Sequence, residues 1–312
     1  MRIYELARKY DMTSKEVVAV CHRLNIVAKA AQSTVKGEDL DTITTFLEAG
    51  KDSAVAMVTV ENHSAVNVVL AKKENVVYVS TECQPFIEIG ELGYTTTQAV
   101  EALKLKNVSV NVFLPYSVQL EGLHDRLTNC LTVNIDINEE VRQATIYKLE
   151  QDDVNYYFVQ EADYFTRAQM YGYEDDVKRF AFYSHAVLQA LPKVCETVKT
   201  LYVNEWHTSF IPLLMHTTYQ TAFYQEIQTV LTVHSLEYQG WFEPHVLKTA
   251  IGISQDYYEN GLMRMGSCVN ILKSGIETAK SVMLTQTAQA QLDQDDMITC
   301  GITSVLQHKI IN

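Results

Sequence analysis

The sequence has no two cysteines close enough to form a C-x-x-C pair, because its six cysteines are scattered along the chain. This spacing argues against a structural zinc site and against a dithiol redox centre, so no metal is expected. Scattered thiols of this kind are typical of reduced, mostly buried cysteines in a cytosolic protein.

Long apolar runs are also missing. The sequence contains no stretch of about 18 apolar residues, the length that a membrane-spanning helix requires. The opening residues Met1–Leu6 (MRIYEL) lack the apolar core of a signal peptide. We therefore expect a cytoplasmic protein without a membrane partner.

Basic residues are scarce relative to acidic ones. Lys and Arg number 25 against 38 Asp and Glu, which gives a net charge of −13. Such a surface repels the phosphates of nucleic acids, so binding to DNA or RNA is not expected. Residues 1–50 contain seven basic and seven acidic residues, so the excess of acid lies downstream of them.

The composition, with 47% apolar and 20% charged residues over 312 positions, is that of a globular protein of two or three domains. Residues 1–50 predict a helical module, with apolar residues at helical spacing and a second helix capped by Thr13 or Ser14. A third helix is expected near Glu38–Leu47. Residues 51–74 predict a linker with one or two extra strands, at Val55–Val60 and Val66–Leu70.

Residues 75–312 predict an α/β domain in which short apolar strands alternate with helices. The expected strands are Val76–Val79, Val108–Leu114, Tyr156–Val159, Thr200–Val203, Thr229–Val233 and Ser281–Leu284. The expected helices are Thr97–Leu103, Asp175–Leu191, a segment ending at Leu214, and Asn270–Ala279. This alternation favours a parallel, doubly wound, three-layer sheet, in which ligands bind beyond the carboxyl ends of the strands.

Several segments at those strand ends resemble the glycogen (starch) synthases that use ADP-glucose. Glu82–Gly93 (ECQPFIEIGELG) is similar to the family's Ser-x-Glu, Pro-Phe and Lys-x-Gly-Gly-Leu-Gly-Asp opening. Thr232–Gly240 (TVHSLEYQG) is similar to TVHNLAYQG. The same order and spacing continue in Asp163–Phe182, Glu205–His207 (EWH), Asn270–Ile276 (NILKSGI) and Gly301–Leu306 (GITSVL).

The first 50 residues resemble a different family, the N-terminal helical domain of bacterial translation initiation factor two. Arg2–Ala7 (RIYELA), Ser14–Val18 (SKEVV) and Leu24–Ile26 (LNI) carry this resemblance. It implies an accessory module, either for docking or, less consistently with the neutral charge, for RNA.

The synthase resemblance implies a Rossmann-like domain that forms the N-terminal half of a GT-B glycosyltransferase. In that family the first half holds the growing glucan and part of the sugar, and the second half holds most of ADP-glucose. Glucose is transferred to the 4-hydroxyl of a glucan end with retention of configuration. The resemblance implies the following cleft residues: Glu82, Gly90, Gly93, Asp163, Trp206, His207, His234 and Asn270, with His207 as the best catalytic candidate.

The residues alone permit simpler interpretations of the same positions. A lone His after a strand is often a hydrogen-bonded structural residue, a Trp is often part of the core, and Asn270 is suited to cap a helix. Glu205 beside His207 suggests acid/base chemistry, but residues two apart on a helix do not face each other.

The sequence departs from the family where the family binds phosphate. Glu88 replaces the family's Lys, Glu91 the second glycine and Tyr94 the aspartate, whereas Gly90 and Gly93 are kept. Unit charges 4 Å apart interact by about 4 kcal/mol at an effective dielectric near 20, so two carboxylates here argue against ADP-glucose binding in the family's manner. If the loop were remodelled so that Lys273 or Arg264 supplied the positive charge, ADP-glucose binding would again be expected.

The sequence also ends near the point where the family enters its second half, which carries cationic residues that clamp the diphosphate. Three functions therefore remain open. The first is a catalytically deficient homologue that binds glucan or a protein partner and has no cofactor. The second is a glucosyltransferase completed by a second domain on another chain, and the third is a protein-binding module unrelated to carbohydrate. A domain without its second half exposes a face, which predicts a homo-oligomer or a partner chain there.

Overall fold

Two units make up the chain, residues Met1–Leu70 and Ala71–Asn312. The computed structural model describes residues 1–10, 12–23, 26, 33–37, 39–45, 47, 73–292, 299, 301–306 and 309. The expected strands at Val55–Val60 and Val66–Leu70 lie outside the described residues.

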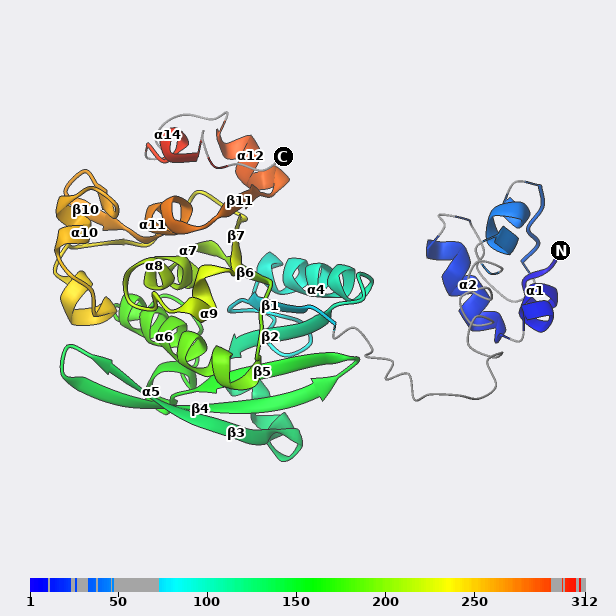
Figure 1. Cartoon of the computed structure of the whole chain (residues 1–312), viewed down its shortest axis with the longest axis horizontal. Helices are drawn as coiled ribbons and strands as arrows, with labels where there is room; N and C mark the ends of the chain where they lie inside the picture. The colour runs from blue at the N-terminus through cyan, green and yellow to red at the C-terminus, as the bar shows by residue number, and fades with distance from the viewer. Residues whose placement is uncertain are drawn as a thin grey trace, which may run out of the picture. The chain divides into compact units, whose positions relative to one another are not determined.

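The first unit is helical, as its apolar spacing predicts (Figure 1). Helix α1 (Ile3–Tyr10) buries one face, formed by Ile3, Leu6, Ala7 and Tyr10, which recur at i, i+3, i+4 and i+7. Helix α2 (Ser14–Arg23) begins at the predicted position, and residues 39–45 and 47 are also helical. Val17, Cys21 and Ile43 join the buried face of α1 in one small core.

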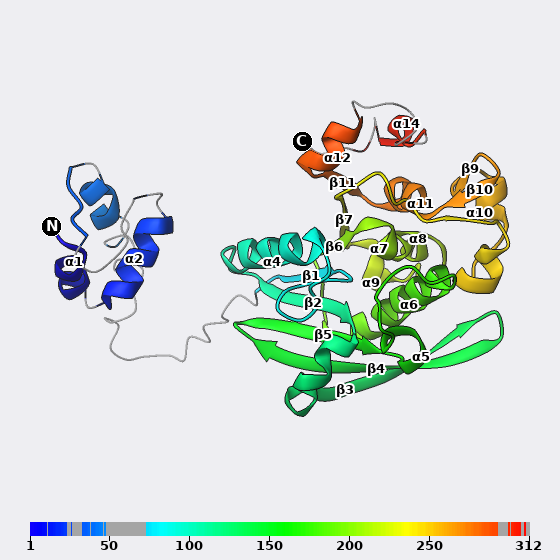
Figure 2. The same ribbon diagram turned by 180° about the vertical axis from the view of Figure 1, so that it is seen from behind.

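The second unit is built on an eight-stranded sheet with the order β11-β7-β6-β1-β2-β5-β4-β3 (Figures 1 and 2). The strands are β1 (Asn75–Val79), β2 (Ser109–Pro115), β3 (Thr128–Ile137), β4 (Glu140–Gln151), β5 (Val154–Gln160), β6 (Thr200–Asn204), β7 (Gln228–Val233) and β11 (Ser281–Leu284). β1 pairs in parallel with β2 and with β6, so the strand order reverses at β1.

Helices cover both faces of this sheet, and Figure 1 shows α4 on one side of the strands and α6 and α8 on the other. The helices that follow the strands are α4 (Glu91–Lys104), α5 (Ala162–Phe165), α6 (Asp176–Val194), α7 (Glu205–Thr208), α8 (Phe210–Thr217), α9 (Ala222–Gln225) and α11 (Ile271–Thr278). The chain moves from β1 toward β2 and then back across β1 to β6 and β7, and crossovers of one hand then place helices on both faces of the sheet.

Shorter elements complete the described part of the unit. They are the 3-10 helix η1 (Val118–Arg126), the π-helical turn η2 (Leu247–Ile251), α10 (Asp256–Glu259), α12 (Gln286–Leu292) and α14 (Thr303–Leu306). A small sheet has the order β8-β10-β9, formed by Trp241–Phe242, Cys268–Asn270 and Arg264–Met265.

The α/β architecture and the strands expected in the parallel part of the sheet are confirmed, but the sheet is mixed. Strands β3 and β4 are antiparallel to each other and β4 is antiparallel to β5, a meander that the sequence reasoning did not include. Its two tight turns, Asn138–Glu139 and Asp152–Asp153, have positive φ at both residues, between 53° and 67°. Turns of this kind match the twist of antiparallel hairpins.

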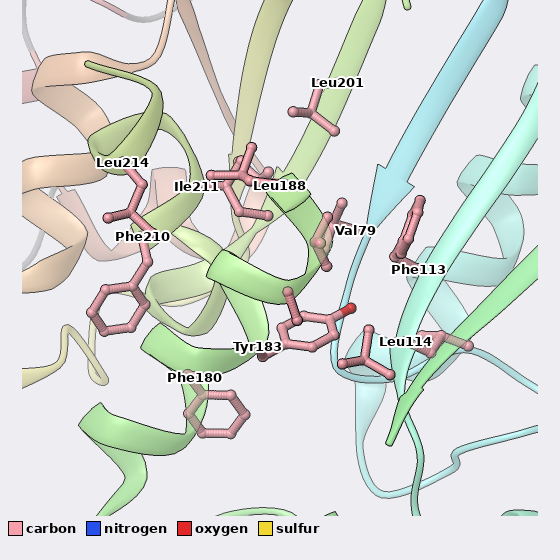
Figure 3. Packing of buried hydrophobic residues seen from close by; sticks show 14 of the residues in the cluster. Val79, Phe113, Leu114, Phe180, Tyr183, Leu188, Leu201, Phe210, Ile211 and Leu214 are labelled. Carbon is pink, nitrogen blue, oxygen red and sulfur yellow. The ribbon is translucent and has the colours of Figure 1, made fainter. Parts of the chain in front are cut away.

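The core lies between the sheet and the α6 and α8 layer. Figure 3 shows buried residues of this core from the strands (Val79, Phe113 and Leu114), from α6 (Tyr183 and Leu188) and from α8 (Phe210 and Ile211). These side chains are fully buried. The packing fixes the ends of β1 and β6 relative to α6, and the cleft described next lies at those ends.

Candidate functional site

A cleft with a volume of about 660 Å³ lies beyond the carboxyl ends of β1 and β6, at the point where the strand order reverses. This is where an open α/β sheet binds its ligands. The residues that line the cleft are Glu82, Ile89, Gly90, Glu91, Leu92, Tyr171, Gly172, Asp176, Glu205, Trp206, His207, Ser235 and Tyr238.

The loop after β1 is held by the buried carboxylate of Glu82. Its Oε2 accepts hydrogen bonds from the backbone N–H groups of Ile89 at 3.1 Å and Gly90 at 2.8 Å. Gly93 packs against the same side chain, since a Cβ there would lie 3.5 Å from Glu82 Oε2 and 3.0 Å from the carbonyl oxygen of Ile87. Of the two predicted glycines, Gly90 lines the cleft and Gly93 supports the loop from behind.

Tyr171 forms a wall of the cleft and is tied to the same carboxylate. Its hydroxyl donates to Glu82 Oε1 at 2.7 Å and lies 2.6 Å from Thr81 Oγ1, which therefore donates to it. Burial, reinforced by the charge of Glu82, raises the pKa of Tyr171 well above its ordinary value. The Tyr171 hydroxyl therefore stays protonated at any physiological pH.

The segment that carries Tyr171 is anchored to the start of α6. Asp176 Oδ2 accepts from the backbone N–H of Gly172 at 2.8 Å, and Asp176 Oδ1 is paired with the buried guanidinium of Arg179. Arg179 also donates to the carbonyl oxygens of Tyr164 at 2.9 Å and Met170 at 3.0 Å. The carboxylates of Glu82 and Asp176 are thus both engaged within the chain.

Trp206 and His207 form the aromatic floor of the cleft. Their ring centroids lie 4.2 Å apart, and the ring of His207 is 4.7 Å from both Tyr171 and Phe180. Trp206 packs edge-on against Phe180 as well, so it serves both the core and the cleft. Trp206 is therefore both a core residue and a cleft residue, and the two interpretations of its position are compatible.

His207 is neutral in this setting. Burial, with a smaller contribution from the charge of Arg179, lowers its pKa to about 3. Its Nδ1 is enclosed and has no hydrogen-bond partner, whereas Nε2 is not among the enclosed unpartnered atoms. Placing the single proton on Nε2 avoids burying an unpartnered N–H. We therefore assign His207 as a neutral donor directed into the cleft.

Glu205 lies beside this floor, at the first position after β6. Its Oε1 accepts from the backbone N–H groups of His234 at 2.5 Å and Ser235 at 3.2 Å, which fixes the segment after β7. Burial raises the pKa of Glu205 to about 7, and these two hydrogen bonds oppose the rise. Its hydrogen bonds run to this segment and not to His207, in line with the expectation that residues two apart do not face each other.

Besides Gly93, three of the predicted residues lie outside the cleft lining. His234 Nε2 bonds Asn204 Oδ1 at 3.1 Å. Asn270 caps α11, where its Oδ1 accepts from the backbone N–H of Lys273 at 2.8 Å, and its Nδ2 donates to Gln239. Asp163 is exposed and pairs with Arg142 at 3.3 Å. The residue-based interpretation of Asn270 as a helix cap matches its contacts.

Positive charge is missing from the cleft: none of the described residues that line it is Lys or Arg. Glu91 lines the cleft with an exposed side chain, while Glu88, which is also exposed, does not. Glu91 is favoured where it stands, because it occupies the first turn of α4.

The two basic residues that could have replaced the family's Lys are engaged elsewhere. Lys273 donates to the carbonyl oxygens of Gly261 and Leu262. Arg264 lies over the ring of Tyr258, 5.8 Å from its centroid. Neither residue belongs to the cleft lining, so neither replaces the positive charge that the family's Lys supplies to the loop after β1.

Some cleft residues were not singled out from the sequence. Tyr171 and Gly172 come from the segment before α6, Asp176 is the first residue of α6, and Ser235 and Tyr238 come from the segment after β7. These residues could have been predicted, because all of them lie in the synthase-like segments Asp163–Phe182 and Thr232–Gly240, from which only Asp163 and His234 were proposed as site residues. The described residues contain no group of three or more His, Cys, Asp or Glu side chains arranged to hold a metal ion.

None of the helices that the structure describes is long and apolar enough to cross a membrane.

Comparison with known proteins places this cleft in context. The model of the family described as starch synthase catalytic domain matches residues 75–308. A glycogen synthase of Lactococcus lactis subsp. lactis is 34% identical over 238 residues, which cover 75% of this chain and 50% of that protein. A glycogen synthase of Clostridioides difficile is 33% identical over 214 residues, covering 67% of this chain and 45% of its own length.

A solved structure has the same fold. The catalytic domain of starch synthase IV from Arabidopsis thaliana, bound to ADP and acarbose, superimposes with a TM-score of 0.68 at 23% identity. The match covers 77% of this chain and 51% of that one. The chain spans about half the length of the curated relatives it matches.

Proposed function

The chain belongs to the starch synthase catalytic domain family, and from this premise we propose that its cleft binds the end of an α-glucan and that the chain alone transfers no glucose. The observation that carries the proposal is the make-up of the cleft. An aromatic floor and a neutral N–H donor are present, whereas cations are missing from the described lining.

A glucan is an uncharged ligand with apolar sugar faces and many hydroxyl groups. Trp206 and Tyr171 offer aromatic surface to such faces, and the Nε2–H of His207 offers a donor to a hydroxyl oxygen. The carboxylates of Glu82 and Asp176 accept hydrogen bonds from donors within the chain, and an uncharged ligand is not repelled by them.

ADP-glucose is a different ligand, because its diphosphate carries negative charge. Stabilising that charge requires cationic or N–H donors directed at it. In this cleft the N–H groups of Ile89 and Gly90 are used by Glu82, and the exposed carboxylate is that of Glu91. We therefore propose that this half of the fold binds ADP-glucose weakly.

A second candidate function is an ADP-glucose-dependent glucosyltransferase that is completed by a second domain. Two large apolar side chains of the cleft lining are exposed, Ile89 by 51% and Tyr238 by 70%. Such a surface is suited to be covered by another domain, from this protein or from a partner chain. Mixing the chain with a separately produced second half of a related glycogen synthase and assaying glucose transfer tests this function.

We propose further that the helical module at residues 1–50 is an accessory docking module, in keeping with its resemblance to the helical domain of initiation factor two, and that the protein works in the cytoplasm. A version that begins at Ala71 should then bind glucan as the full chain does. A loss of glucan binding in that version would assign the helical unit a part in the site.

Affinity electrophoresis in gels containing glycogen tests the main proposal. The full chain should migrate more slowly as glycogen increases, and the variant His207→Ala should lose this retardation. The variant His245→Ala is the matched control, because His245 is exposed and lies outside the cleft lining. If glycogen retards both variants equally, the glucan binds outside this cleft.

A further inference from the structure

The backbone at Glu205 is unusual for its residue type. Its φ is 59°, in the left-handed region that glycine favours, although Glu205 carries a long side chain. It is the first residue after β6, and it lines the cleft while remaining only 8% exposed. Conformations of this kind persist where the surrounding structure holds them, and they gather at ligand sites.

The two carboxyl oxygens of Glu205 have different surroundings. Oε1 accepts the backbone N–H groups of His234 and Ser235, as described above. Oε2 takes part in none of the hydrogen bonds among the described residues, and it is not one of their enclosed unpartnered atoms. One oxygen therefore holds the chain and the other is open to the cleft.

We propose that Glu205 is a ligand-binding residue whose Oε2 accepts a hydrogen bond from a hydroxyl group of the bound glucan, while Oε1 keeps the segment His234–Tyr238 in place at the cleft wall. The inference rests on the proposed glucan-binding function. It adds a polar contact to the aromatic floor, and it makes the affinity for a neutral ligand depend on pH.

Ionised Glu205 is the form that should bind best. A carboxylate that accepts a hydroxyl forms a charge-assisted hydrogen bond, which is roughly twice as strong as the bond between neutral groups. Burial raises the pKa of Glu205 to about 7, so its protonation state changes near neutral pH. Affinity for glucan should therefore rise as the pH increases through 7.

The other groups around Glu205 do not account for such a change. The pKa of His207 is lowered to about 3 and that of His234 to about 4 by burial, so both rings stay neutral from pH 6 to pH 8. The hydroxyl of Tyr171 stays protonated there. The remaining charged side chains that face this region from the loop after β1 and from α6 are Glu82, Glu91, Asp176 and Arg179.

Isothermal titration of the full chain with maltoheptaose at pH 6 and pH 8 tests the proposal. The affinity should increase about fivefold over this range, as expected when a neutral hydrogen bond becomes charge-assisted. The variant Glu205→Gln keeps an oxygen acceptor but does not ionise, so its affinity should be the same at both pH values. A wild-type affinity that does not change, or a change that persists in Glu205→Gln, would overturn the inference.

A second readout separates a ligand contact from a structural role. The amide proton shifts of His234 and Ser235 should titrate with a midpoint near pH 7, because both N–H groups donate to Glu205. Saturating maltoheptaose should lower that midpoint, since the hydroxyl favours the ionised form. A midpoint that is unchanged by bound glucan would show that Oε2 makes no contact with it.

The variant Glu205→Asp covers the case in which Glu205→Gln does not fold. It keeps the carboxylate and shortens the side chain by one methylene. It should retain a pH-dependent affinity. If no variant and no pH gives maltoheptaose binding, the proposed function fails, whereas binding without pH dependence defeats only the role of Glu205.

Discussion

The backbone N–H of Gly90 donates a 2.8 Å hydrogen bond to Oε2 of Glu82. A glycine-rich loop before a helix commonly directs such N–H groups at a phosphate. Here the chain supplies its own carboxylate to the N–H groups of Ile89 and Gly90. The loop is thereby stabilised by an internal anion, and the cleft next to it is left to neutral ligands.

Replacing Glu82 with Gln should therefore lower stability. The carboxylate accepts three hydrogen bonds, from Ile89, Gly90 and Tyr171, and an amide cannot accept them all. We expect a loss of about 1–3 kcal/mol in the free energy of unfolding, measured by urea denaturation. The control Glu88→Gln removes an exposed carboxylate and should change stability by less than about 0.5 kcal/mol. Equal effects of the two variants would contradict the role of Glu82.

Gly240 should not tolerate a side chain. Its φ is +69°, and a Cβ there would lie 2.6 Å from a ring carbon of Trp206 and 3.1 Å from Ile271. Gly266 has a similar φ of +61° but open space around it. Gly266→Ala should lower the free energy of unfolding by about 1–2 kcal/mol, because of the backbone strain alone. Gly240→Ala should lower it by about 1–3 kcal/mol more, because its Cβ also clashes with Trp206. Thermal unfolding of both variants measures the difference, and similar melting temperatures would argue against this close packing.

Removing the charge of Glu91 should improve the binding of ADP. Glu91 lines the cleft and Glu88 does not, although both are exposed acids only three positions apart in the sequence. The variant Glu91→Gln should raise the affinity for ADP about two- to fivefold, with the larger gain at low salt, as is typical of exposed charges. Glu88→Gln should have a smaller effect. Equilibrium dialysis at two salt concentrations measures both, and a larger effect from Glu88→Gln would contradict the placement of these side chains.

Acid should destabilise the fold through its buried histidines. Burial lowers the pKa of His207 to about 3 and that of His234 to about 4, from 6.5. Between pH 4.5 and 6.5 the unfolded chain binds protons on these rings that the folded chain does not. The free energy of unfolding therefore falls as the pH decreases, by at most about 1.4 kcal/mol per pH unit for each net proton.

Glu205 acts in the opposite direction, because its pKa rises to about 7 from 4.5 and the folded state holds its proton. The variant Glu205→Gln removes this opposing contribution. Its stability should fall more steeply between pH 6.5 and pH 4.5 than that of the wild type. Urea denaturation across this range measures both slopes, and a shallower slope in the variant would refute the assignment of a raised pKa to Glu205.

The sequence predicted the buried parallel strands well and missed the antiparallel meander. Strands such as β1 and β2 are buried on both faces and are therefore continuous apolar runs. β3 is half exposed, and its residues alternate as Thr132, Val133, Asn134, Ile135, Asp136. That alternation, followed by the turn Asn138–Glu139, is a hairpin signal that a search for apolar runs overlooks.

The candidate site was predicted in part, for a related reason. Glu82, Trp206 and His207 closely follow strands β1 and β6, and Gly90 ends the loop between β1 and α4, so strand-end reasoning places them in the cleft. His234 follows β7 in the same way, yet its ring turns back toward Asn204. Side-chain direction depends on hydrogen-bond partners far away in the sequence, which the spacing of one segment does not reveal.

Isothermal titration of the full chain, once with maltoheptaose and once with ADP-glucose, tests the central claim most directly. We expect maltoheptaose to bind and ADP-glucose to show no measurable heat of binding at the same concentrations. His207→Ala should abolish the binding of maltoheptaose. Binding of ADP-glucose without binding of maltoheptaose would refute the proposed glucan site, because it would mean that this cleft recognises a diphosphate without a cation in its described lining.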